Sequence, residues 1–91
     1  MRMTDEKSEW EQRILHALGL TPRGGRMRRW SYRNYYTVSF GDPVMEAMVE
    51  RGLMVRRRPG KPGDLVCHHV TDAGAEFAGV GSRFRKEDRL Q

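Results

Sequence analysis

The residues best suited to chemistry in this sequence are arginines, and the chemistry that they favour is the binding of phosphate. Five arginines and no carboxylate lie in the basic loop at residues 22–34, namely Arg23, Arg26, Arg28, Arg29 and Arg33. A guanidinium pairs bidentately with phosphate oxygens, and the rings of Trp30 and Tyr32 in the same loop can stack on unpaired bases. The loop is therefore interpreted as a nucleic-acid-binding arm. The alternatives are contact with an acidic protein, or a solvated loop whose aromatic side chains anchor it to the core.

A second basic group follows in the other half of the chain. It surrounds the sequence PGKPGD and consists of Arg56, Arg57, Arg58 and Lys61. Pro and Gly at these positions predict a turn between two strands, and basic residues at such a tip are suited to a nucleic-acid backbone or minor groove. Positive charge on an exposed edge strand also prevents aggregation, and this alternative fits the same residues.

Other reactive residue types do not form a recognisable site. His68 and His69 are neighbours on an expected strand, so they point to opposite faces, and only Cys67 shares a face with His69. Two ligands do not hold a metal, and no CxxC or HxxxH spacing occurs, so we expect neither a metal nor another cofactor. Neither a phosphate-binding Gly-rich loop nor a nucleophile elbow is present, and we expect no enzymatic activity.

Length and composition limit the remaining possibilities. The 91 residues allow a single domain, residues 1–91, with a small core, and a net charge of +5 favours an acidic partner. A secreted domain of this size usually carries several disulfides, whereas this chain has one cysteine, which indicates a cytoplasmic protein. We also expect no membrane segment, because the sequence holds no apolar run of the length that a span needs.

Capping signals and apolar spacing predict three helices. The first is expected to start at Ser8, in a capping box with Glu11, and to end at Gly19. The second starts at Asp42-Pro43 and ends at Gly52. The third is capped by Thr71, with Asp72 in its first turn and small residues that permit close packing. The charged tail at residues 81–91 is expected to fray.

Strands are expected in the segments between these helices. Residues 35–40 are rich in aromatic and β-branched side chains, which favours a short extended segment. Residues 53–58 and 65–70 form a predicted hairpin, with Leu53 and Val55 on one face of the first strand. Val66, His68 and Val70 share one face of the second. One core is predicted from Trp10, Ile14, Leu15, Leu18, Val44, Met48, Leu53, Val55, Val70 and Phe77.

The stretch VERGLMVRRRPGKPGDLVCHHVTDAGAEF resembles the second half of a winged-helix domain of bacterial transcription regulators. The matching features are the step Gly52-Leu53 after a helix, the basic wing from Arg56 to Asp64, and the helix start from Thr71 to Gly74. The expected second helix departs from that family, because its outward face carries Asp42, Glu46, Ala47 and Glu50. Carboxylates repel phosphates, so any nucleic-acid contact should fall on the arm and the wing.

These features predict an α+β fold, a reduced winged helix-turn-helix-like domain with three helices and a β-hairpin wing. The whole chain, including LGLT near its start and YRNYY in its middle, is also similar to small proteins of phage and prophage genomes. The expected function is non-enzymatic binding of nucleic acid, DNA more than RNA, in the host cytoplasm. The alternatives are an inhibitor or adaptor that docks on an acidic host or phage protein, and a structural virion component.

Overall fold

The computed structural model describes residues 3–20, 30–31 and 33–89, with side chains from residue 8 onward. The elements are helix α1 (Met3–Leu18), strand β1 (Tyr36–Ser39), helix α2 (Pro43–Glu50), strands β2 (Met54–Arg56) and β3 (Leu65–Val70), and helix α3 (Asp72–Phe77). Two short 3-10 turns, Gly81–Arg83 and Lys86–Asp88, follow α3. The α+β class predicted from the sequence is confirmed. Among the described helices, none combines the length and apolarity that crossing a membrane requires.

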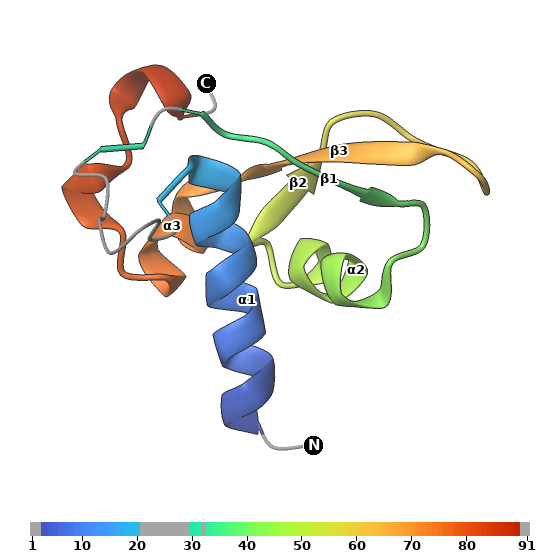
Figure 1. Ribbon diagram of the computed structural model, residues 1–91, viewed down its shortest axis with the longest axis horizontal. Coiled ribbons are helices and arrows are strands. Elements are labelled where there is room, and N and C mark those ends of the chain that lie inside the picture. Colours follow the sequence, from blue (N-terminus) through green and yellow to red (C-terminus); the bar gives the residue numbers. More distant parts are fainter. Residues whose placement is uncertain (1–2, 21–29, 32, 90–91) are drawn as a thin grey trace.

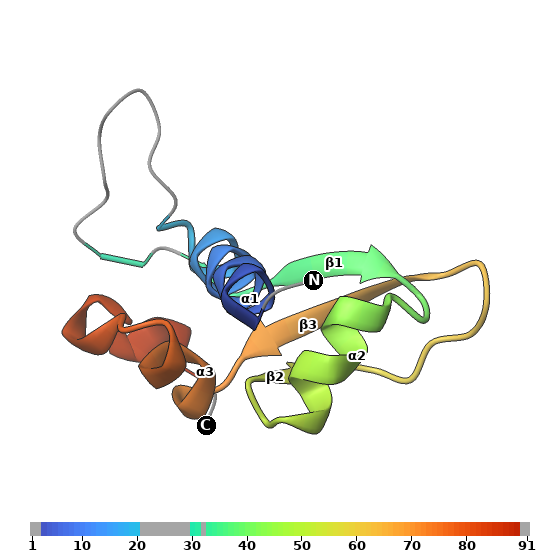
Figure 2. The same cartoon turned by 90° about the horizontal axis from the view of Figure 1, so that it is seen from below.

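The three strands form one antiparallel sheet in the order β1-β3-β2. Tyr36 pairs with His68, and Met54 pairs with Val70, so the inward positions of β3 lie opposite those of its neighbours. Helices α1 and α2 lie against one side of the sheet, and α3 lies beyond the end of β3 (Figures 1 and 2). The other side of the sheet carries no helix in the described part of the chain.

The predicted caps of α2 and α3 are confirmed. Asp42 accepts a hydrogen bond from the Met45 amide at 2.9 Å, and Thr71 accepts one from the Gly74 amide at 3.0 Å. The Thr71 hydroxyl also donates to the Gly52 carbonyl, which ties α3 to the residue that ends α2. The predicted start of α1 is wrong, because the helix begins at Met3 rather than at Ser8. Glu and Lys before Ser8 are good helix formers and let the helix continue past that position.

One hydrophobic core lies between the helices and the inner side of the sheet. Most of the predicted core is buried, and Leu15, Val44 and Phe77 pack against it while half-buried. Val55 is the exception, with 40% of its surface exposed. The β2–β3 register turns Met54 inward, and side chains alternate along a strand, so Val55 must face outward. Leu53 precedes the strand and is buried by the turn after α2, where its amide donates to the Met48 carbonyl.

The small residues of α3 bring that helix close to its neighbours, as predicted. A Cβ at Gly74 would lie 2.1 Å from the Leu53 carbonyl oxygen, a distance that no side chain can occupy. Gly74 and Ala75 are both buried. Any larger residue at position 74 would therefore push α3 away from the core.

The segment after α3 packs against the domain, so the prediction that it frays is wrong for its described residues. Phe84 is 2% exposed and belongs to the core. Arg89 stacks its guanidinium over the Phe84 ring at 4.6 Å and pairs with Asp72 at 2.9 Å. The burial of this aromatic ring explains why a strongly charged segment stays on the fold.

Candidate functional site

Four of the arginines predicted to form the arm, with one of its aromatic residues, lie outside the described residues: Arg23, Arg26, Arg28, Arg29 and Tyr32. Trp30 is described, and its side chain is exposed. Arg33 donates from Nε and Nη2 to the His16 carbonyl, at 3.2 and 2.6 Å, and its guanidinium lies over the Tyr35 ring. The same carbonyl accepts a hydrogen bond from the Gly19 amide at 3.1 Å, so Arg33 adds side-chain donors to the hydrogen bonding at the end of α1.

The residues that hold the end of the basic loop were not predicted from the sequence. Ser31 is buried; its amide donates to the Arg83 carbonyl, and its hydroxyl donates to Asp88 at 2.6 Å. The Asn34 side chain donates to the Val70 and Asp88 carbonyls, and its oxygen accepts from the Val70 amide at 2.7 Å. The loop therefore leaves the described core from a fixed point, at the end of β3.

Arg56 differs from the other three basic residues of the predicted wing. Its Nη2 contacts both carboxylate oxygens of Glu46 on α2, at 2.7 and 2.6 Å. The pairing of Arg56 with His68 turns its side chain toward the helices, which explains why it meets α2. Arg56 therefore neutralises Glu46, one of the carboxylates expected to repel phosphate, and is already engaged within the domain.

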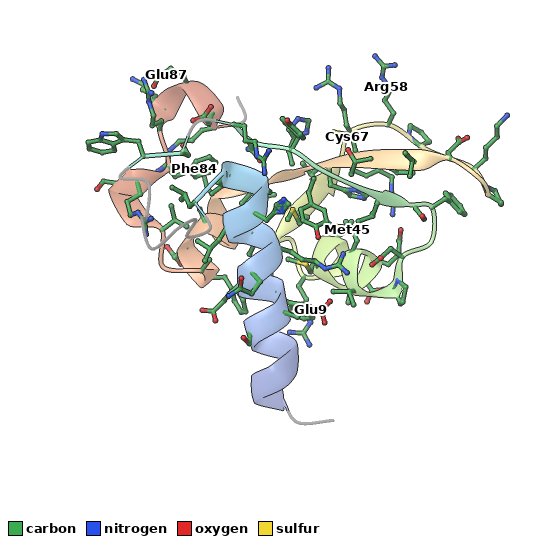
Figure 3. All side chains as sticks on the ribbon, viewed as in Figure 1. Glu9, Met45, Arg58, Cys67, Phe84 and Glu87 are labelled. Carbon is green, nitrogen blue, oxygen red and sulfur yellow. The ribbon has the colours of Figure 1, made fainter. Side chains whose placement is uncertain are left out.

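Arg57, Arg58 and Lys61 lie on the connection between β2 and β3, residues 57–64, which we call the hairpin loop. All three are exposed, and none forms an ion pair with a carboxylate in the described part of the chain. Figure 3 shows Arg58 projecting on the side of the sheet opposite α2. These residues are the described members of the predicted site whose charges remain available to a partner.

A groove of about 520 Å³ opens between the two sides of the hairpin loop. The Arg57 amide donates to the Cys67 carbonyl at 3.0 Å, but Pro59 has no amide hydrogen with which to continue the ladder. The two sides therefore separate. The groove is lined by Arg57, Arg58, Pro59, Gly60, Asp64, Leu65, Val66 and Cys67. Asp64 is the carboxylate in this lining, and it accepts from the Lys61 amide at 3.1 Å.

Gly60 allows the hairpin loop to pack on the sheet. A Cβ at this position would lie 2.6 Å from Cγ2 of Val66 and 3.3 Å from Cδ2 of Phe40. The Phe40 amide also donates to the Asp64 carbonyl at 3.0 Å. These contacts hold the base of the hairpin loop against β1 and β3, so its cations project from a packed support.

The side of the sheet on which the described chain places no helix is called the outer face here. Its side chains follow from the register and the alternation of the strands: Tyr35, Thr37, Ser39, Val55, Arg57, Leu65, Cys67 and His69. None of these residues is a carboxylate. Leu65 is 74% exposed and Tyr35 is 50% exposed, so the outer face presents apolar and aromatic surface beside its cation.

Carboxylates gather instead around the helices. Arg13 pairs with Glu9 on α1 and with Asp42 at the start of α2, both at 3.3 Å. Glu46 on α2 pairs with Arg56. The described part of the domain thus has an acidic helical side, partly neutralised by its own arginines, and an outer face without acidic groups.

His68 and His69 lie on opposite faces of β3, as predicted. His68 is buried and its Nδ1 lies 3.2 Å from the Val66 carbonyl, while Nε2 has no hydrogen-bond partner among the described residues. Burial lowers the pKa of His68, which keeps the ring neutral at pH 7. The pKa of His69 is also lowered, first by desolvation and then by the nearby Arg57. Among the described residues, no three His, Cys, Asp or Glu side chains are grouped so as to hold a metal ion.

Comparisons of the chain with protein-family models, curated proteins and solved structures found no match.

Proposed function

We propose that this chain is a reduced winged-helix domain that binds nucleic acid through its hairpin loop and its basic arm, without catalysing a reaction. The observation that carries the proposal is the group Arg57, Arg58 and Lys61, exposed on a packed hairpin loop and without a carboxylate partner in the described chain. Cations held in this way can neutralise phosphates without first breaking an internal ion pair.

The order of the elements supports the winged-helix assignment. Helix α2 is followed by Gly52, a strand, a basic hairpin and a return strand, and Thr71 then caps another helix. Here the hairpin loop corresponds to the wing. A DNA-reading member of the family would have a helix-turn-helix with an exposed basic recognition helix. Between β1 and β2 the chain has the eight-residue α2, whose basic neighbours are paired with its own carboxylates. We therefore assign contact with the phosphate backbone to the hairpin loop rather than base reading to α2.

The salt dependence of binding tests this proposal. The double variant Arg57→Gln/Arg58→Gln removes two cations from the hairpin loop, and the matched variant Arg51→Gln/Lys86→Gln removes two exposed cations elsewhere. Each lost phosphate contact should reduce the slope of log K against log salt by about 0.9 for duplex DNA. We expect the slope of the first variant to decrease by an amount that approaches the loss of two phosphate contacts. The slope of the second variant should change little. Equal slopes in the two variants, or no binding at about 50 mM salt, would contradict the proposal.

A second candidate function is docking on an acidic protein, and the exposure of Leu65 favours it. A leucine that is 74% exposed beside arginines is the kind of apolar contact that protein interfaces bury. This candidate predicts that one acidic protein binds the chain, and that both Leu65→Ser and Arg57→Gln/Arg58→Gln abolish the complex. A nucleic-acid contact made by the hairpin cations alone would tolerate Leu65→Ser.

A further inference from the structure

We infer that the outer face of the sheet binds a single-stranded nucleic acid, which would lie along it between Tyr35 and the hairpin loop. This inference rests on the proposed function and names the strand state of the nucleic acid and the surface that receives it. Its basis is the combination, on one side of the described sheet, of hairpin-loop cations, the exposed Tyr35 ring and apolar surface, with no carboxylate among the residues of the outer face.

The exposed Tyr35 ring and the hairpin-loop cations lie at opposite ends of this surface. Asn34 forms hydrogen bonds with Val70 at the end of β3, so its neighbours Arg33 and Tyr35 lie at that end. The Phe40 amide forms a hydrogen bond with Asp64 in the hairpin loop, at the start of β3. Figure 1 shows β1 entering beside the end of β3 and the hairpin loop projecting at the opposite end. The five steps from Tyr35 to Phe40 span about 17 Å at the rise of a strand. An extended strand of nucleic acid is long enough to meet the hairpin-loop cations at one end and the Tyr35 ring at the other.

Between the two ends the outer face offers groups that contact bases better than phosphates. Thr37 and Ser39 present hydroxyls from β1, and Leu65 and Val55 present exposed apolar side chains. Tyr35 presents an exposed ring, and Arg33 stacks on that ring at 5.1 Å. At the β1 edge of the sheet, between this face and α1, is a groove of about 220 Å³, lined by His16, Arg33, Tyr35, Tyr36 and Thr37. A base could stack on the edge of this groove, since aromatic rings bind bases of any sequence.

The state of the bases distinguishes a single strand from a duplex. In a duplex the bases are stacked inside, so a flat protein surface meets mainly phosphates and sugars. Such a ligand would use Arg57 and Arg58 but would bury Leu65, Val55 and Tyr35 against charged backbone. A single strand presents phosphates and bases together, and sheets that bind RNA use this combination of exposed rings and flanking cations. Charge complementarity therefore favours nucleic acid, and the apolar middle of the face favours the unpaired form.

The test measures fluorescence anisotropy with three labelled probes of the same mixed sequence, about 16 nucleotides long: single-stranded DNA, single-stranded RNA and duplex DNA. We expect either or both single strands to bind more tightly than the duplex. Tyr35→Ala should weaken single-strand binding by about 5- to 150-fold, the effect of losing one stacked base, and leave duplex binding unchanged. Tyr35→Phe keeps the ring and should bind as the unmodified protein does. Circular dichroism spectra of each variant report whether the fold is retained.

His69→Ala provides an independent variant on the outer face, at a half-buried position of β3. Reduced single-strand binding in both Tyr35→Ala and His69→Ala supports the inference. Duplex binding as tight as single-strand binding, or full single-strand binding by Tyr35→Ala, overturns it while the proposed function stands. Failure of all three probes to bind at about 50 mM salt overturns both and favours the acidic-protein partner.

Discussion

The burial of Phe84 makes the segment after α3 part of the folded domain, and truncating this ring should show how much stability it contributes. Phe84 is one of the largest fully buried side chains, and it packs into the core with Arg89 stacked over its ring. Replacing a buried Phe by Ala costs about 3–5 kcal/mol, because apolar contact is lost and a cavity remains. Domains have a total stability of roughly 0.05–0.15 kcal/mol per residue, so this loss is a large share for a chain of 91 residues.

Thermal unfolding followed by circular dichroism measures the effect of Phe84→Ala. A loss of 1 kcal/mol lowers the melting temperature of a domain of this size by about 4–8 °C, so we expect a decrease of at least about 12 °C. Leu65→Ala is the matched control, because Leu65 is a large apolar side chain that is 74% exposed. Exposed substitutions usually change stability by less than about 0.5 kcal/mol. A Phe84→Ala melting temperature within a few degrees of the control would refute the placement of this ring in the core.

The remaining predictions concern pH, the hairpin loop and the arm. Burial lowers the pKa of His68 below 6.5, so the unfolded chain binds a proton before the folded protein does as the pH falls. The urea concentration at the midpoint of unfolding should therefore be constant above pH 6.5 and decrease below it. The lowered pKa of His69 acts in the same direction. An unchanged midpoint between pH 7.5 and 5.0 would contradict this. Gly60→Ala forces the hairpin loop away from Val66, and this overpacking should lower the free energy of unfolding by about 1–3 kcal/mol, measured by urea unfolding. A stability equal to that of the unmodified protein would show that the contact relaxes freely. The triple change Arg26→Gln, Arg28→Gln and Arg29→Gln should weaken binding to all nucleic-acid sequences alike. The slope of log K against log salt should decrease by about one unit per lost phosphate contact, whereas an unchanged slope would exclude the arm from the interface.

The separation of charge between the two sides of the sheet links these predictions to function. The helical side holds pairs such as Arg13 with Asp42 and Arg56 with Glu46, which stabilise the domain only modestly because they are partly exposed to water. Their main consequence is that two basic residues are engaged internally. A partner that is attracted by the net positive charge therefore meets available cations on the hairpin loop and not on α2.

Contacts between residues close in sequence could be predicted without the structure. The caps of α2 and α3 join residues three positions apart, from Asp42 to Met45 and from Thr71 to Gly74, so the local residue types are sufficient to identify them. The alternation along β3 likewise placed Val66, His68 and Val70 on one face, and all three are buried in the structure. The position of the hairpin loop followed from its Pro and Gly residues, which do not continue a strand ladder.

The tertiary structure decided which of the basic and polar residues are engaged. Arg56 and Arg57 are neighbours with the same side chain, but strand register directs the first to Glu46 and the second to the outer face. Ser31 reaches Asp88 across 57 positions and Asn34 reaches the Asp88 carbonyl across 54, and no periodic pattern marks such contacts. Pairings over these separations depend on how the whole chain packs. The sequence by itself therefore determined the elements and the basic segments, whereas the packing of distant elements determined which cations remain available to a partner.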